Sequence, residues 1–139
     1  MRISRQLLDE VVAHARDESP NECCGMIAAA DGRAISVHRA RNAARTPKLR
    51  YEMDGQDQHD IFKAIEDAGN EIGAIYHSHP RSEPVPSQTD INLAKWWPDP
   101  LYVIVGLEHR EPDVRTWRIV DGTVSEAALE VEDGPAPTI

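Results

Sequence analysis

The sequence predicts a single layered α+β domain, in which a mixed central β-sheet is flanked by helices. Three observations lead to this prediction. Helix-like and strand-like segments alternate along the 139 residues, two Asp-Gly pairs separate consecutive strand-like segments, and neither a linker nor an internal repeat interrupts the order. A chain of this length is sufficient for one hydrophobic core and short for two domains of ordinary size.

The first helix is predicted near the N-terminus. Ser4 is a favourable N-cap residue, and Pro20 lies just beyond the end of the pattern. The apolar residues between them recur at helical spacing: Leu7, Leu8, Val11, Val12 and Ala15. One face of this helix is therefore expected to pack on the sheet.

A hairpin is predicted to follow. Residues 23–30 form a short apolar segment, the pair Asp31-Gly32 is a favourable two-residue turn, and residues 34–41 form the returning strand. Residues 49–53 are predicted to add a further strand before the next helix begins.

A second helix and a buried strand occupy the middle of the chain. Asp54 is predicted to cap this helix and Gly69 to end it. Its apolar face includes Ile61, Ile65 and Ala68. Residues 71–76 then form an apolar segment that runs directly into His77, as a buried strand would.

The last third is predicted to hold a helix and three strands. Ser87 is the expected N-cap of a helix over residues 88–97, after a loop at 81–86 that contains two prolines. The predicted strands are residues 101–107, 114–120 and 123–131. The domain is thus predicted over residues 1–131, and residues 132–139, with two prolines, are predicted to be a flexible tail.

The charge of the chain opposes non-specific binding to nucleic acid. The net charge is −9, whereas phosphate contacts require clustered lysine and arginine. A local basic stretch does occur, at Arg39, Arg41, Arg45, Lys48 and Arg50. It has two interpretations: a solvated strand edge, or a patch that meets an acidic partner.

No membrane segment is expected, and the protein is predicted to be cytoplasmic. The longest apolar runs fall well short of the roughly 20 residues that span a bilayer. Asp9, Glu10 and Arg16 interrupt the N-terminal segment, unlike the apolar region of a secretory signal. Cys23 and Cys24 are adjacent, which suits neither a disulfide framework nor a CxxC zinc site, so both are predicted to be packing residues.

The segment from His77 to Asp90 carries the residues that indicate chemistry. Alternate residues of a strand point to one side, so His77 and His79 present both imidazoles to one point, while Ser78 faces away. Asp90 follows the proline-containing loop and can fold back over them. Two histidines and one carboxylate are suitable ligands for a catalytic zinc, and leave one coordination position free.

A hydrolytic zinc site also needs groups that move protons and stabilise charge. The metal lowers the pKa of its bound water from about 15.7 to near 7. Glu22 is the candidate general base, and the Ser87 hydroxyl is the candidate donor to the oxyanion. Each residue also has a purely structural explanation: for example, Ser87 with Asp90 is a capping-box pattern.

The five residues together resemble the motif of the JAMM (MPN-plus) metalloproteases. The motif is a glutamate, then His-x-His-Pro, then Ser-x-x-Asp after six residues, and this sequence matches every position of it. The similarity to the family is not confined to the motif and covers about residues 1–131. The resemblance implies an MPN/JAMM (cytidine-deaminase-like) architecture with one Zn²⁺ per chain. It implies that His77, His79 and Asp90 hold the zinc, that Glu22 is the general acid/base, and that Ser87 stabilises the oxyanion.

Within that family, the chain is similar to the compact bacterial members that resemble the CysO-cysteine peptidase. Residues 42–54, 76–90 and 117–122 carry this similarity. It implies hydrolysis of the bond between the C-terminal Gly-Gly of a ubiquitin-like sulfur carrier and an attached cysteine, in cysteine biosynthesis. An extended Gly-Gly tail can add beside a sheet edge.

Several alternatives remain open at this point. Two histidines and a carboxylate also bind Fe(II) in non-haem oxygenases. An MPN domain can be a non-catalytic interaction scaffold, and a member of the family can instead remove a C-terminal extension or conjugate from another ubiquitin-like protein. The sequence decides neither the oligomeric state, for which a homodimer is one alternative, nor whether the loop at 81–86 gates the site.

Overall fold

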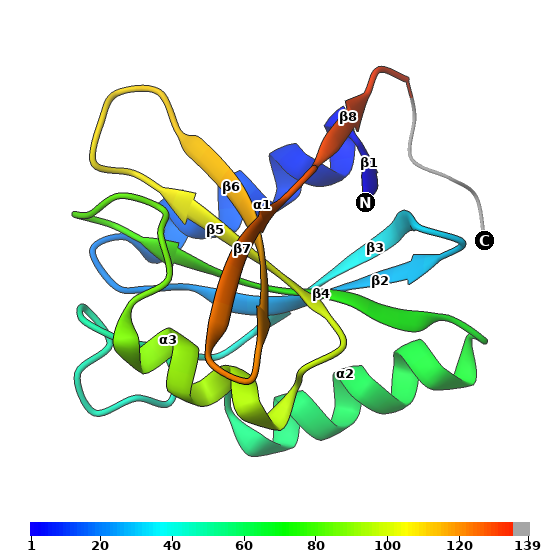
Figure 1. The fold of residues 1–139 in the computed structure, drawn as a ribbon, viewed down its shortest axis with the longest axis horizontal. Coiled ribbons are helices and arrows are strands. Elements are labelled where there is room, and N and C mark those ends of the chain that lie inside the picture. Colours follow the sequence, from blue (N-terminus) through cyan, green and yellow to red (C-terminus); the bar gives the residue numbers. More distant parts are fainter. Residues whose placement is uncertain (135–139) are drawn as a thin grey trace.

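A computed structural model describes residues 1–134 and has the predicted α+β fold (Figure 1). Within these residues, one eight-stranded mixed sheet has the order β7-β6-β5-β4-β2-β3-β1-β8. The strands are β1 (Arg2–Ser4), β2 (Cys24–Ala30), β3 (Arg33–Ala40), β4 (Glu71–His79), β5 (Leu101–Gly106), β6 (Asp113–Val120), β7 (Thr123–Ala127) and β8 (Glu130–Glu132). The helices are α1 (Arg5–Glu18), α2 (Gly55–Asp67) and α3 (Gln88–Leu93), and a 3₁₀ turn, η1 (Ala94–Trp96), follows α3.

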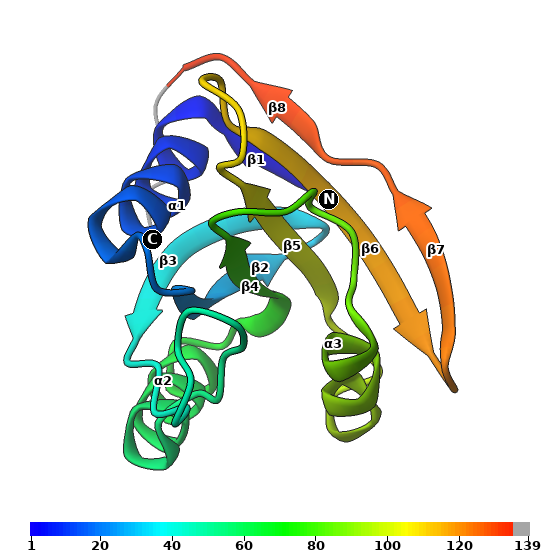
Figure 2. The ribbon, with the colours of Figure 1, turned by 90° about the vertical axis from the view of Figure 1, so that its left-hand side faces the viewer.

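The sheet is strongly curled, and helices cover both of its faces (Figure 2). Helix α1 packs on one face, with Leu7 and Val11 against residues such as Tyr76 and Val103. Helices α2 and α3 lie on the other face, where they bury two separate apolar clusters. Because side chains alternate along a strand, β4 contributes Tyr76 to the α1 face and the residues on either side of it to the α2/α3 face.

Local signals in the sequence explain the ends of the elements. The Ser4 hydroxyl accepts the Leu7 N–H at the start of α1, and the Asp54 carboxylate accepts the Asp57 N–H at the start of α2. Both Asp-Gly pairs form their turns in the left-handed region, with φ values of 50° and 76° at the first pair and 51° and 76° at the second. The third helix is predicted at 88–97, but its last turn tightens into η1.

Two of the predicted strands are wrong or incomplete. Residues 49–53 form only an isolated bridge between Met53 and Asn42, because the Asn42 side chain bonds the Arg50 carbonyl and the Glu52 N–H that a neighbouring strand would have bonded. The strand predicted at 123–131 divides, and its second half, β8, pairs with β1 at the opposite edge of the sheet. The short strand β1 is absent from the sequence prediction.

The C-terminal residues are described only in part. Glu132 is the last residue of β8 and forms an ion pair with Arg33, at 3.0 Å. Residues 135–139 of the predicted tail lie outside the described residues, and the domain boundary at 131 stays a prediction. Among the described residues, no helix has the length and apolar content needed to cross a membrane.

Candidate active site

The candidate site lies at the carboxyl end of β4, where β4 runs parallel to β5. Ligand sites of open sheets often lie at the carboxyl ends of parallel strands. His77 and His79 project from β4 toward the α2/α3 face, and their exposed fractions are 0% and 4%. Ser78 lies between them on the other side, where its hydroxyl accepts the Cys23 N–H at 2.8 Å. The alternation predicted for this segment therefore places both imidazoles together.

Asp90 completes a triangle of potential metal ligands with the two histidines. The Nε2 atoms of His77 and His79 lie 3.2 Å apart, and Asp90 Oδ2 lies 3.1 Å from each of them. Ligand atoms bonded at about 2.0–2.1 Å in a tetrahedral zinc site lie about 3.3 Å from one another. The three atoms are therefore spaced as three ligands of one zinc ion would be.

A hydrogen bond outside the triangle determines which nitrogen of His79 can bind a metal. His79 Nδ1 lies 2.8 Å from the Glu83 carbonyl, which can only accept, so Nδ1 carries the proton and Nε2 has a free lone pair. The His77 ring stacks on Tyr51 at 4.5 Å between ring centres. Burial tends to raise the pKa of Asp90, but its close contacts with His77 and His79 and the hydrogen bond from the Ser87 N–H hold that pKa well below its usual range.

Helix α3 places Asp90 through its first turn. The Ser87 hydroxyl accepts the Asp90 N–H at 3.1 Å, and Asp90 Oδ2 accepts the Ser87 N–H at 2.9 Å. This is the capping box that the sequence predicts as the structural explanation of the pair. The Ser87 hydroxyl proton remains available, because its oxygen is the acceptor in the cap, and the side chain is exposed. The pair can therefore cap the helix and also contribute to the site.

Glu22 lies in the turn between α1 and β2, with its carboxylate beside the two histidines. Its exposed fraction is 5%, and its carboxylate belongs to a group in which the ligand atoms of Glu22, His77 and His79 all lie within 4.8 Å of one another. Its Oε1 has no hydrogen-bond partner among the described residues. Burial raises the pKa of Glu22 to about 7; nearby Asp90 adds to the rise and His79 opposes it. Such a carboxyl group suits proton transfer near neutral pH.

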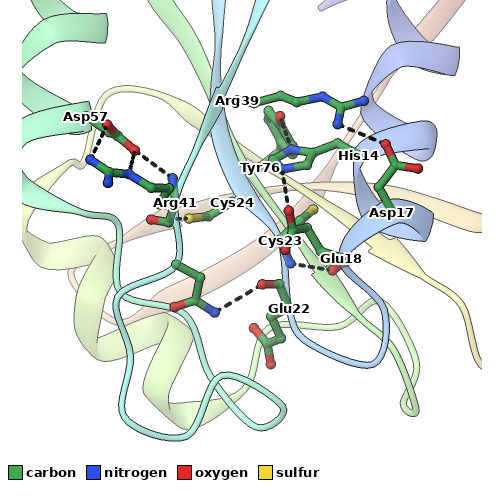
Figure 3. A network of polar contacts seen from close by, with 12 residues as sticks. His14, Asp17, Glu18, Glu22, Cys23, Cys24, Arg39, Arg41, Asp57 and Tyr76 are labelled. Carbon is green, nitrogen blue, oxygen red and sulfur yellow. Dashed lines mark hydrogen bonds and ion pairs between the residues drawn. The ribbon is translucent and has the colours of Figure 1, made fainter.

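The backbone of Glu22 is tied to the loop that follows β3 (Figure 3). The Glu22 N–H donates to the Pro47 carbonyl at 2.7 Å, and the Glu22 carbonyl accepts the Asn42 side-chain amide at 3.0 Å. Asn42 also bonds three backbone groups of its own loop, at Ala44, Arg50 and Glu52. One side chain thus holds together the loop and the turn that carries Glu22.

A cavity of about 440 Å³ lies on the same face as the site, between α2 and α3. Tyr51 and Ile75 connect the two, because Tyr51 stacks on His77 and Ile75 precedes His77 by two residues on β4. Its other walls are largely apolar and include Met26, Trp97 and Tyr102. The cavity therefore lies next to the site, with Tyr51 and Ile75 between them.

Known proteins share this chain's sequence over nearly all of its length. Residues 4–120 match the family described as prokaryotic homologs of the JAB domain. The chain is 40% identical over 133 residues to the CysO-cysteine peptidase of Mycobacterium tuberculosis, covering 93% of this chain and 89% of the relative.

The chain belongs to the prokaryotic JAB-domain family. It is also 39% identical over 108 residues to the desampylase of Haloferax volcanii, covering 73% of this chain and 77% of the relative. The probable TtuB-protein conjugate cleaving protease of Thermus thermophilus is 36% identical over 132 residues, covering 93% of this chain and 81% of the relative. A solution structure of a Desulfitobacterium hafniense protein superposes with a TM-score of 0.85 at 27% identity, covering 96% of this chain and 93% of that one.

Family membership confirms several predictions made from the sequence. This JAB-domain protein is a JAMM-type hydrolase of the compact prokaryotic subgroup, and its sheet is that of JAB1/MPN domains. The non-haem oxygenase and the non-catalytic scaffold are thereby disfavoured. A buried glutamate and two histidines form a group that can hold a metal ion, in agreement with the family's chemistry.

The loop at 81–86 is anchored to the JAB-domain sheet. The Trp117 indole N–H donates to the Pro84 carbonyl at 2.9 Å, and Pro84 lies directly over Gly106, where an added Cβ would approach it to 2.7 Å. Glu83 bonds His79 as described above. In this structure the loop therefore contacts both the sheet and His79.

Sequence reasoning missed two residues that contact the site of this JAB-domain protein. Tyr51 is buried and stacks on His77, although its segment is predicted as a strand. Asn42 fixes the loop through its four hydrogen bonds. The only signal for either residue was the similarity of residues 42–54 to one subgroup of the family.

Replacing Asn42 with alanine is expected to lower kcat by about ten-fold and the free energy of unfolding by about 1–3 kcal/mol. The change leaves partly buried backbone groups of the loop and of Glu22 without a partner. Steady-state kinetics and urea unfolding measure the two effects. Asn92→Ala is the matched control, because Asn92 is exposed and, within residues 1–134, its side chain bonds only that of Gln88. Equal kcat in both variants would contradict a positioning role for Asn42.

Proposed function

We propose that this protein is a zinc-dependent peptidase or isopeptidase that hydrolyses the amide bond after the C-terminal Gly-Gly of a ubiquitin-like sulfur carrier. The single observation that carries the proposal is the ligand triangle of His77, His79 and Asp90, with 3.1–3.2 Å edges, beside the buried carboxyl of Glu22. The donors suit zinc, and the neighbouring acid suits proton transfer.

Each residue has a distinct role in the proposed reaction. His77, His79 and Asp90 would hold the zinc, and Glu22, whose Oε1 has no hydrogen-bond partner among the described residues, would stay free as the acid/base. Bound zinc supplies an activated water and polarises the substrate carbonyl. Glu22 takes the proton from the attacking water and returns it to the leaving amine. The Ser87 hydroxyl donates to the oxyanion of the tetrahedral intermediate.

The cysteine adduct of a carrier is the preferred substrate in this proposal. The support is the 40% identity to the CysO-cysteine peptidase, which extends over 93% of this chain. Hydrolysis of that bond releases free cysteine, which places the reaction in cysteine biosynthesis. The largely apolar cavity lined by Tyr51 offers space for an extended C-terminal tail of the carrier.

The decisive experiment offers the purified protein a ubiquitin-like carrier ending in Gly-Gly-Cys and measures released cysteine. We expect release by the zinc-loaded protein, loss of release after treatment with a chelator, and recovery when zinc is added back. A carrier ending in Gly-Gly-Cys that stays intact in the presence of zinc would overturn the proposed substrate.

A second candidate function is removal of another protein, or of a C-terminal extension, from a ubiquitin-like modifier. It is supported by the similarity to the Thermus thermophilus relative, whose name describes cleavage of protein conjugates. A carrier linked through Gly-Gly to a lysine side chain tests it in the same assay. Faster cleavage of the lysine conjugate than of the cysteine adduct would favour this second function.

A cytoplasmic location also belongs to the proposal. Cys23 packs in the core beneath α1 and Cys24 in the core beneath α2, so the two thiols face opposite sides of the sheet. Burial raises the pKa of Cys23 to about 12. Two buried thiols that form no disulfide are typical of proteins in a reducing compartment.

A further inference from the structure

The loop between β3 and α2 is basic, although the chain as a whole is acidic. Residues 42–51 contain Arg45, Lys48 and Arg50 and no acidic residue, in a chain with a net charge of −9. All three side chains are exposed. We call the surface formed by these three residues the basic loop patch.

The structure divides the basic stretch at 39–50 into two parts, of which Figure 3 shows the first, Arg39 and Arg41. Arg39 forms an ion pair with Asp17 at 2.9 Å, and Arg41 forms ion pairs with Asp54 at 3.1 Å and Asp57 at 3.0 Å. These two arginines are neutralised within the domain. In residues 1–134, by contrast, no carboxylate forms an ion pair with any member of the basic loop patch. Its positive charge is therefore available to another molecule.

The loop that carries the basic loop patch borders the candidate active site at two points, Pro47 and Tyr51. Pro47 accepts the Glu22 N–H at 2.7 Å, and Tyr51 stacks on His77 at 4.5 Å. The patch residues occupy the intervening and adjoining positions of the same loop. Figure 1 shows this loop on the left of the molecule, at the same end as the loop that leads from β4 to α3. A molecule bound in the site therefore lies next to the patch.

An exposed leucine lies within the patch. Leu49 has an exposed fraction of 78%, the largest among the exposed large apolar side chains of the described residues. Single exposed leucines are common and carry little weight alone. Here it lies between Lys48 and Arg50 in the sequence, so an exposed apolar side chain is flanked by two basic residues.

We propose that the basic loop patch docks an acidic face of the ubiquitin-like carrier, outside the Gly-Gly tail that enters the site. This inference rests on the proposed function, since the docked partner is the substrate itself. The net charge of this chain, −9, repels an acidic carrier. A local basic patch beside the site attracts it at the position where the Gly-Gly tail must enter. Charges at the rim of an interface act mainly on encounter and orientation.

The test compares two substrates on a triple variant, R45Q/K48Q/R50Q. One substrate is a carrier of net negative charge ending in Gly-Gly-Cys, and the other is an uncharged short peptide with the same ending. We expect KM for the carrier to rise about ten-fold at low salt with kcat unchanged, and the kinetics of the peptide to stay the same. The rise should shrink at high salt, because the exposed charges are screened.

Two further variants make the result specific to this surface. The triple variant R5Q/K63Q/R118Q removes the same total charge from exposed residues on α1, α2 and β6, and its carrier KM should stay within two-fold of wild type. Leu49→Ser should raise the carrier KM by a factor that does not depend on salt, because it removes an apolar contact.

The outcomes separate the two proposals. A wild-type protein that cleaves neither substrate overturns the proposed function and the docking proposal with it. A wild-type protein that cleaves both, together with an R45Q/K48Q/R50Q variant whose carrier KM is unchanged, overturns the docking proposal alone. The docking proposal is also overturned if R45Q/K48Q/R50Q loses activity equally on carrier and peptide, since the loop would then act through the catalytic residues.

Discussion

Replacing Glu22 with glutamine is expected to lower kcat by at least about 10³-fold while the protein keeps one zinc per chain. Glutamine has the shape of glutamate but cannot accept the proton, and general acid/base catalysis contributes roughly 10²–10⁴-fold to such reactions. The fold should tolerate the change, because Glu22 Oε1 has no hydrogen-bond partner among the described residues. Cysteine release from a Gly-Gly-Cys carrier and zinc content by atomic emission measure the two properties.

The control for this variant is Glu18→Gln, at the end of α1, the helix that precedes Glu22. Glu18 is half exposed and lies 3.9 Å from His14, on the α1 side of the sheet. Its replacement should leave both kcat and zinc content near wild type. Turnover of the Glu22→Gln protein at a wild-type rate would remove Glu22 from the mechanism and leave the acid/base role unassigned.

Replacing His77 or Asp90 with alanine is expected to abolish metal binding and, with it, all activity. Either change removes one corner of a triangle whose edges measure 3.1–3.2 Å, and two remaining ligands hold zinc poorly. Atomic emission of the purified variants measures the loss. Thermal unfolding with and without chelator gives a second readout, since metal stabilises only a protein that binds it.

Two controls separate loss of metal from loss of structure. His14→Gln changes another buried histidine, which bonds Tyr76 on the α1 face of β4, and should keep the metal. Asp90→Asn keeps an oxygen that can accept the Ser87 N–H, so it should preserve the start of α3 better than Asp90→Ala does. Unchanged zinc stoichiometry in His77→Ala or Asp90→Ala would place the metal site elsewhere.

The features that could be predicted from the sequence are those that neighbouring residues determine. Ser4, Asp54 and Ser87 cap helices through bonds to residues three positions on, so their types alone mark the boundaries. The pair His77 and His79 converges because a strand alternates its side chains. The ligand triangle then needs only one turn of helix after a short loop.

The features that were missed depend on residues distant in sequence. The pairing of β8 with β1 joins the two ends of the described chain, and no local pattern in residues 130–132 indicates which edge of the sheet they join. The stacking of Tyr51 on His77 likewise depends on a loop folded by the Asn42 side chain. Glu22 was a candidate base from the sequence, but no local pattern shows that it lies beside the histidines, because more than fifty residues of sequence separate them.

One carboxylate oxygen, Asp90 Oδ2, takes part in both a helix cap and the ligand triangle. Asp90 Oδ2 accepts the N–H that starts α3, and the same atom lies 3.1 Å from each histidine nitrogen. Helix α3 spans six residues, and so short a helix has little stability of its own. If the first turn of this helix unfolds, Asp90 Oδ2 moves away from the histidines, and the ligand triangle is therefore lost at the same time. Loss of activity on mild heating should consequently report a local opening at Ser87, ahead of cooperative unfolding of the sheet.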